Sequence, residues 1–156
     1  SKGSQAANSF RPYAMLGLEI FADFIVMFLA MYAMIASLDH FFLNIGNVYM
    51  KLMMVAPMTL LMLFFMRHMY TWKVANLIVV LAAVALFAVG WFGMRTQAGV
   101  NDAQFVRSMI PHHSGAILMC KNAKLSDPQL VKLCRDIIAA QQREIGEMKD
   151  ILARVQ

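Results

Sequence analysis

Charged residues are scarce in this chain, and they are scarcest in its first two-thirds. Of the 156 residues 60% are hydrophobic and 15% are charged, whereas a soluble globular domain is typically about 45–50% apolar and about a quarter charged. Among the nine acidic residues, only Glu19, Asp23 and Asp39 precede residue 100. A water-soluble monomer could not cover this much apolar surface. The composition therefore excludes a wholly soluble protein and predicts a membrane protein with a polar C-terminal module.

Motifs of several function classes are also missing. The 14 Lys and Arg residues are dispersed and are not interleaved with aromatic residues, which argues against nucleic-acid binding. The chain has no Ser/His/Asp triad, no His-Glu-x-x-His zinc motif and no Gly-rich phosphate loop after a strand. We therefore expect neither enzymatic activity nor a nucleic-acid partner.

Three apolar stretches are long enough to cross a lipid bilayer, which requires about 20 residues of helix. They cover about residues 14–38, 45–66 and 74–94, and aromatic residues lie near their ends, as is typical of membrane interfaces. The sequence thus predicts a membrane domain of residues 1–97 with three helices.

The basic residues predict how these spans are oriented. Lys2, Arg11, Arg67 and Lys73 fall on the side of the membrane that carries the N-terminus, and fewer bases fall on the other side. The positive-inside rule then places the N-terminus in the cytoplasm and, after three spans, the C-terminal module outside it. The expected location is a bacterial inner membrane with the module in the periplasm.

Residues 98–156 are predicted to form an antiparallel helical hairpin. In its first arm, residues recur at three- and four-residue spacing and so share one face of a helix: Phe105, Met109, His112, Ala116 and Met119. The second arm is expected to start at Ser126-Asp127-Pro128-Gln129, with Ser126 as the cap. So short a hairpin buries little by itself, so a second copy or the outer ends of the spans must complete a bundle.

These considerations predict a homo-oligomer, most simply a dimer that pairs two hairpins into a four-helix bundle. The third span carries Gly90 and Gly93 with Ala82 and Ala85, small residues that would allow close approach of helices from two copies.

The chain has only two cysteines, one in each arm of the predicted hairpin. Cys120 lies near the end of the first arm and Cys134 lies early in the second, so the two can face each other across the turn. In an exported module the expected state is a disulfide. The alternative makes Cys120, beside Met119, a thiolate ligand for copper.

The first arm contains histidine and methionine residues close together in the sequence. Met109 lies three residues before His112 and four before His113, and such neighbours share one side of a helix. Imidazole and thioether form a soft ligand set that suits copper better than magnesium or calcium. Adjacent histidines diverge by about 100° on a helix, so we expect one of them to bind with Met109. In the alternative, Met109 and Met119 are core residues and both histidines are solvated.

The chain also resembles a known family, the domain-of-unknown-function 305 family. The resemblance covers about residues 98–156 and rests on Asp102, Phe105, Met109-Ile110-Pro111-His112-His113, Ala116-Ile117, Met119, Gln141, Glu144-Ile145 and Met148. That family is ferritin-like, helical and exported, with members linked to copper binding. The resemblance implies a ferritin-like half-bundle that binds a copper ion. It adds Met148 to the candidate ligands Met109, His112, His113 and Met119, and Glu144 as a carboxylate that could orient a ligand.

Methionine is abundant in the predicted spans. The first span steps by four residues through Met15, Glu19, Asp23, Met27 and Met31, and the second does so through Met50, Met54, Met58, Met62 and Met66. Carboxylates inside a membrane usually face a protein interior or an ion path. The candidates for a metal path are Glu19, Asp23, Met27, Met31, Met54, Met58 and Met62. Methionine is also a flexible apolar filler, which is the simpler explanation.

Together these features predict an all-α protein with three transmembrane helices followed by a C-terminal antiparallel hairpin. The expected function is metal binding at the bacterial envelope, as a copper sequestration or delivery factor. The alternatives are a copper transporter that uses the methionine-rich spans and a structural helical anchor for a partner protein.

Overall fold

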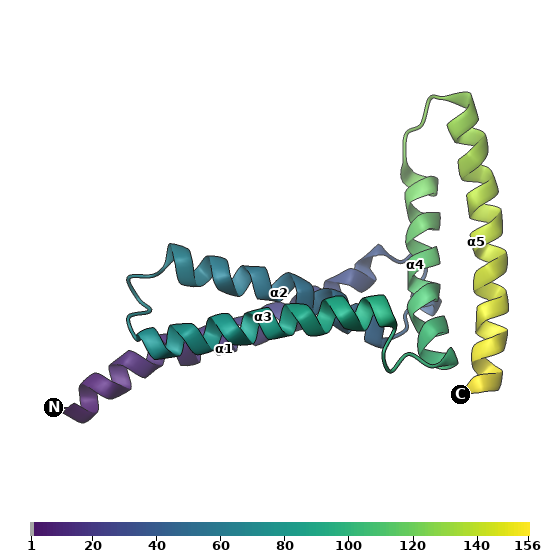
Figure 1. Cartoon of the computed structure of the whole chain (residues 1–156). Helices are drawn as coiled ribbons and strands as arrows, with labels where there is room; N and C mark the ends of the chain where they lie inside the picture. The colour runs from purple at the N-terminus through teal and green to yellow at the C-terminus, as the bar shows by residue number, and fades with distance from the viewer. Residues whose placement is uncertain (1) are drawn as a thin grey trace. The chain divides into compact units, whose positions relative to one another are not determined.

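The computed structural model describes residues 2–156, apart from the side chains of Ser4, Ala6 and Ala7, and every regular element in this range is helical. Along the chain these are α1 (Lys2–Ala30), the 3₁₀ turns η1 (Met31–Met34) and η2 (Leu38–His40), α2 (Ile45–Phe65), α3 (Lys73–Thr96), α4 (Asp102–Asn122) and α5 (Pro128–Val155) (Figure 1). The prediction of an all-α fold is confirmed.

The chain divides into two compact units, each made of two separate segments. One unit, called here the membrane unit, consists of Ser1–Phe28 and Val48–Ala98. The other, called the hairpin unit, consists of Leu29–Asn47 and Gly99–Gln156. The sequence analysis assigned residues 29–47 to the membrane domain, but in the structure they pack with the hairpin.

Three helices are long and apolar enough to cross a membrane, namely Asn8–Met34, Ile45–Phe65 and Lys73–Thr96. The second and third agree with the predicted spans to within two residues. The end predicted for the first span, residue 38, is wrong, because α1 ends at Ala30 and Ile35 is extended after η1. The backbone N–H of Ala36 donates to Oγ of Ser114 at 2.6 Å, so this hydrogen bond replaces one that a longer helix would make.

Two glycines of α3 set the close packing inside the membrane unit. Gly90 and Gly93 are both buried. A Cβ atom at Gly90 would lie 2.6 Å from the carbonyl oxygen of Tyr49 and 2.8 Å from Cγ of Met53, and one at Gly93 would overlap the Tyr49 ring. These glycines therefore serve the packing of α2 on α3 within one chain, and the prediction that they face a second copy is wrong.

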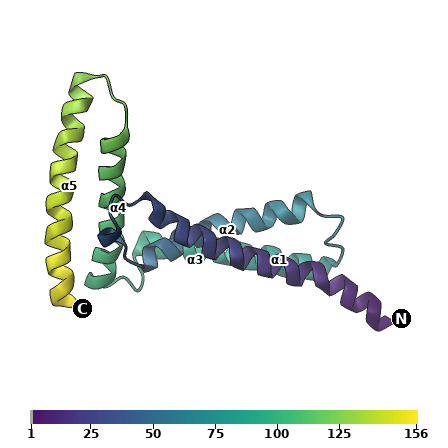
Figure 2. The ribbon, with the colours of Figure 1, turned by 180° about the vertical axis from the view of Figure 1, so that it is seen from behind.

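In the hairpin unit α4 and α5 lie side by side and run in opposite directions, as Figures 1 and 2 both show. Their shared core consists of Val106, Ile110, Ile117, Ile145 and Leu152. Asn101 caps α4 by accepting a hydrogen bond from the backbone of Gln104. Asp127 caps α5 in the same way, with Pro128 in the first turn, so the expected cap at Ser126 is wrong by one residue.

Residues 29–47, called here the strap, complete this core. Ala36 and Phe42 of the strap pack against the buried residues of the hairpin. The side chain of Asn44 donates to the carbonyl oxygen of Arg107 at 3.4 Å, and the backbone N–H of Ile45 donates to Oε1 of Gln104 at 3.1 Å. The hairpin thus gains from its own chain part of the cover that was expected from a second copy or from the outer ends of the spans.

Candidate functional site

Helix α4 carries its imidazole and thioether groups on two different sides. Its buried side consists of Val106, Ile110, His113, Ser114 and Ile117. His112 is exposed and Met119 is 73% exposed, so these two candidate ligands point away from the seam between α4 and α5. As expected for adjacent residues on a helix, the two histidines do not share an environment.

His113 forms the central polar contact of the seam. Its Nε2 lies 2.6 Å from Oε2 of Glu144 on α5, and only 11% of the His113 side chain is exposed. An ionised carboxylate can only accept a hydrogen bond, so Nε2 carries the proton and donates it to Glu144. This contact fixes the tautomer and orientation of the ring, as carboxylates do for metal-binding histidines.

The other ring nitrogen of His113 is buried without a hydrogen-bond partner. Among the described residues Nδ1 has none, although it is shielded from solvent. In the neutral ring this atom presents a lone pair. A buried polar atom that is left unpaired costs about 1–3 kcal/mol, so a site of this kind favours a ligand that accepts the lone pair.

Two methionines lie in register with the His113–Glu144 pair. Met109 precedes His113 by one turn of α4, and Met148 follows Glu144 by one turn of α5. Because residues four apart share a helix face and the two helices are antiparallel, the pair brings Met109 and Met148 to the same level of the seam. Both side chains are half-buried, and Met148 packs against the core.

These positions divide the predicted ligands into two groups. Met109 and Met148 are half-buried and lie one turn from His113 and Glu144 respectively, whereas His112 and Met119 lie on the exposed side of α4. Within residues 2–156 no cluster of three or more His, Cys, Asp and Glu side chains could hold a metal ion. One imidazole with two thioethers is the chemistry of a soft ion.

A second histidine, which the sequence analysis did not single out, attaches the strap to α4. Nδ1 of His40 lies 2.7 Å from Oγ of Ser114, which also accepts the backbone N–H of Ala36. Ser114 is completely buried, so its hydroxyl links the strap to the hairpin and does not face solvent. The polar residues Ser37, Asp39 and His40 at the end of the first predicted span were the signal that could have revealed this contact.

Two titratable groups of the strap have shifted pKa values. Burial lowers the pKa of His40, and hydrogen bonds from Lys149 and Ser37 hold the pKa of Asp39 well below its usual range. Both groups bind protons less readily in the folded state than in the unfolded state. Their contribution to stability is therefore complete above their unfolded pKa values and is lost as the pH falls.

The candidates for a path through the membrane differ in their exposure. Asp23, Met27, Met31, Met58 and Met62 are half-buried, whereas Glu19 is exposed. Met54 is 46% exposed, and its sulfur accepts a hydrogen bond from Nζ of Lys51 at 3.5 Å.

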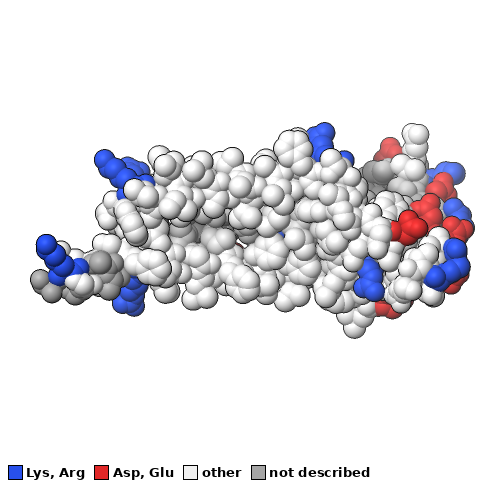
Figure 3. Space-filling view, turned by 60° about the horizontal axis from the view of Figure 1, so that its bottom comes forward, with Lys and Arg blue, Asp and Glu red and all other residues white. Residues whose placement is uncertain are grey.

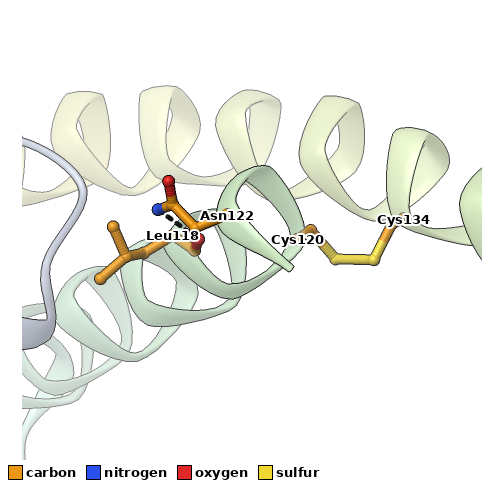
Figure 4. Close-up of a disulfide and its surroundings, with 4 residues drawn as sticks. All are labelled: Leu118, Cys120, Asn122 and Cys134. Atoms are coloured by element: carbon orange, nitrogen blue, oxygen red, sulfur yellow. Dashed lines mark hydrogen bonds between the residues drawn. A yellow bond between two sulfur atoms is a disulfide. The ribbon is translucent and has the colours of Figure 1, made fainter. Parts of the chain in front are cut away.

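Cys120 and Cys134 form a disulfide that joins the end of α4 to the start of α5, as Figure 4 shows. Their Cα atoms are 5.3 Å apart and the residues are 14 apart in sequence. Near it, the side chain of Asn122 donates to the carbonyl oxygen of Leu118 at 2.9 Å and so satisfies the last turn of α4 (Figure 4). The sulfur atoms are bonded to each other, so the thiolate alternative for Cys120 applies only to a reduced form.

Replacing both cysteines by serine is expected to lower the stability of the hairpin unit by about 3 kcal/mol, because the disulfide closes a short loop in the unfolded chain. The measurement is thermal unfolding of the full chain followed by circular dichroism. Dithiothreitol should lower the melting temperature of the parent to that of the variant and leave the variant unchanged. Equal melting temperatures for the oxidised parent and the variant would contradict this expectation.

Comparison with known proteins identifies the family. Residues 94–156 match the model of "Domain of unknown function (DUF305)". The chain is 35% identical over 143 residues to "Uncharacterized protein L153" of Acanthamoeba polyphaga mimivirus, an alignment that covers 89% of this chain and 91% of the viral protein. No solved structure matches. The chain belongs to the DUF305 family.

Proposed function

We propose that this chain is a membrane-anchored metal-binding protein whose hairpin seam binds copper through Met109, His113 and Met148. The proposal rests on the hydrogen bonding of the two ring nitrogens of His113. Glu144 holds the ring through Nε2, while Nδ1 is buried and has no hydrogen-bond partner among the described residues. A metal ion bound at Nδ1 would use a buried polar atom of the seam that has no hydrogen-bond partner in the described part of the chain.

The neighbouring side chains fit a soft ion better than a hard one. Met109 and Met148 add thioether sulfurs one helical turn from the His113–Glu144 pair, and neither adds charge. Copper binds imidazole and thioether well, whereas magnesium and calcium prefer oxygen ligands. Glu144 would hold the His113 ring in place and increase its basicity as a ligand. The role that follows is copper sequestration or delivery at a membrane surface.

The proposed topology places the hairpin on the side opposite the N-terminus. Lys2, Arg11, Arg67 and Lys73 favour a cytoplasmic location for the end that carries them, and an odd number of spans separates this end from the hairpin. The disulfide supports an oxidising compartment on the hairpin side. The curated relative is viral, so we do not restrict the proposal to a bacterial envelope.

Transport of copper through the spans is the weaker alternative. Glu19 is exposed, and the sulfur of Met54 is engaged by Lys51. A homodimer stays a prediction, although the strap already covers part of the hairpin.

Replacing Met109 and Met148 by leucine in the full chain is expected to weaken Cu(I) binding at least tenfold. Leucine nearly conserves volume, so the fold should survive while both thioethers are lost. Cu(II) binding should weaken less, because sulfur prefers the softer ion. The measurement is anaerobic titration of detergent-solubilised protein against a chromophoric Cu(I) chelator. His113→Gln should also reduce binding.

The matched control is His112→Gln with Met119→Leu on the exposed side of α4, and it should bind Cu(I) like the parent. Loss of binding in this control alone would move the site to the exposed face. Parent-like binding in the seam variants as well would refute the seam site. Failure of the parent itself to bind copper would leave the structural-anchor function as the better conclusion.

A further inference from the structure

A group of exposed basic side chains surrounds the loop between α2 and α3. It consists of Arg11 on α1, Arg67 and His68 after α2, and Lys73 at the start of α3, and all four side chains are exposed. We call this group the basic rim. Figure 3 shows Lys and Arg side chains at the end of the membrane unit that carries the N-terminus, with no acidic side chain there on the face shown.

Contacts within the membrane unit hold the basic rim together. The hydroxyl of Tyr13, two residues after Arg11, accepts the backbone N–H of Trp72 at 3.0 Å and donates to Oδ1 of Asn76 at 2.6 Å. The ring of Tyr13 also packs edge-on against the buried Tyr70, with centroids 5.4 Å apart. Arg11 and Lys73 therefore flank one ordered contact between α1 and the loop.

Arg67 is held at the other end of the same loop. Its Nη1 donates to the carbonyl oxygen of Phe64 at 3.2 Å, and its guanidinium lies 5.3 Å from the centre of the Phe64 ring. The loop thus separates Arg67, whose guanidinium is held by Phe64, from the exposed Lys73, and His68 lies between them in the sequence.

The sequence leaves this positive charge uncompensated. No Asp or Glu occurs before Glu19, and none occurs between His40 and Asn101. Glu19 lies two turns of α1 beyond Arg11, toward the apolar part of the span. An anion that approaches the basic rim would meet three permanent cations and no nearby carboxylate at the same level.

The flanks of the basic rim are apolar, which distinguishes its partner from a soluble anion. Phe10 is 60% exposed, Phe64 61%, Phe65 69% and Trp72 50%. Exposed aromatic rings beside Lys and Arg at the end of an apolar helix are typical of the membrane interface. A ligand that satisfies both features carries an anionic group joined to a hydrocarbon chain.

We propose that the basic rim binds the headgroups of anionic phospholipids, with the phosphate near Arg11, Arg67 and Lys73 and the acyl chains along the exposed aromatic residues. This site is independent of the copper site, since it lies in the other unit and uses other residues. It makes the membrane unit selective for the lipids around it, because each cation near an anionic surface strengthens binding by about fivefold.

The test uses the full chain with Trp91→Phe, which leaves Trp72 as its sole tryptophan. The protein is reconstituted in phosphatidylcholine vesicles that contain a minor fraction of brominated phosphatidylglycerol or of brominated phosphatidylcholine, and quenching of Trp72 is measured. We expect the brominated phosphatidylglycerol to be enriched on the order of fivefold or more at Trp72. High salt should reduce this enrichment, since it screens exposed charges.

In the variant Arg11→Gln, Arg67→Gln, Lys73→Gln, both brominated lipids should quench Trp72 equally. Its emission in pure phosphatidylcholine should equal that of the parent, which shows that the loop is intact. The matched control, Lys121→Gln, Lys124→Gln, Lys132→Gln, removes three exposed cations of the hairpin unit and should keep the preference. Equal quenching in the parent, or an unchanged preference in the rim variant, would overturn the proposal. So would loss of the preference on addition of millimolar inorganic phosphate, which would indicate a site for free phosphate.

Discussion

A fragment of residues 99–156 is expected to be helical but to lack a cooperative thermal transition. In the full structure Ala36 and Phe42 of the strap pack against the hairpin core, and the hydroxyl of Ser114 is satisfied by strap atoms. Loss of a fully buried phenylalanine typically costs about 3–5 kcal/mol, and loss of the half-buried Phe42 together with Ala36 should still remove a large share of the stability of a small domain. Far- and near-ultraviolet circular dichroism during a melt would separate helix content from fixed packing.

The control for this fragment is the same hairpin joined to residues 29–47 by a flexible Gly/Ser linker, which should regain a cooperative melt. Its stability should then fall between pH 7 and pH 5, because unfolded histidine has a pKa of about 6.5 whereas burial lowers the pKa of His40 in the folded state. His40→Asn should remove most of this fall. A fragment without the strap that melts as cooperatively as the joined form would show that the strap is dispensable.

Replacing Gly90 by alanine is expected to destabilise the membrane unit by about 1–3 kcal/mol, the usual cost of overpacking. The new Cβ would lie 2.6 Å from the carbonyl oxygen of Tyr49, and a backbone atom cannot turn aside as a side chain can. The helices α2 and α3 must therefore separate locally. A thermal melt in mild detergent, followed by tryptophan fluorescence, would measure the loss.

Gly17→Ala is the matched control, since Gly17 also lies inside a helix and a Cβ there meets nothing within 4 Å. Alanine is the better helix former, so this variant should equal or exceed the parent in stability by up to about 1 kcal/mol. If the two variants have the same melting temperature, the close approach of α2 to Gly90 does not contribute to the stability of the membrane unit.

The parts of the fold that follow from local pattern could be predicted from the sequence. Long apolar runs identified all three helices that could cross a membrane, and the hairpin followed from helical spacing and from the start signal at Ser126-Asp127-Pro128-Gln129. The four-residue spacing of Met109 and His113 also predicted that they share one helix face. Each of these inferences depends on residues within about two turns of one another, where spacing determines geometry.

The parts that depend on distant contacts could not be predicted. Nothing in the spacing of residues 29–47 shows that they pack with a hairpin that begins about 50 residues later. The partner of His40 is Ser114, and the partner of Gly90 is Tyr49, so their roles depend on tertiary packing. The one-residue error in the predicted cap of α5 has a local cause. Ser126 and Asp127 are both good caps, and Asp127 directly precedes the proline that starts the helix.

The two-segment hairpin unit has a consequence for how the protein is made. The strap is synthesised before α2 and α3, whereas its partners on α4 and α5 come last. At about 5–20 residues per second, roughly 100 further residues take on the order of 5–20 seconds to appear. During that interval Phe42, the imidazole of His40 and the backbone N–H of Ala36 lack the contacts that α4 later provides. Biosynthesis of this small protein therefore includes a waiting period in which chaperones and proteases can act on the strap.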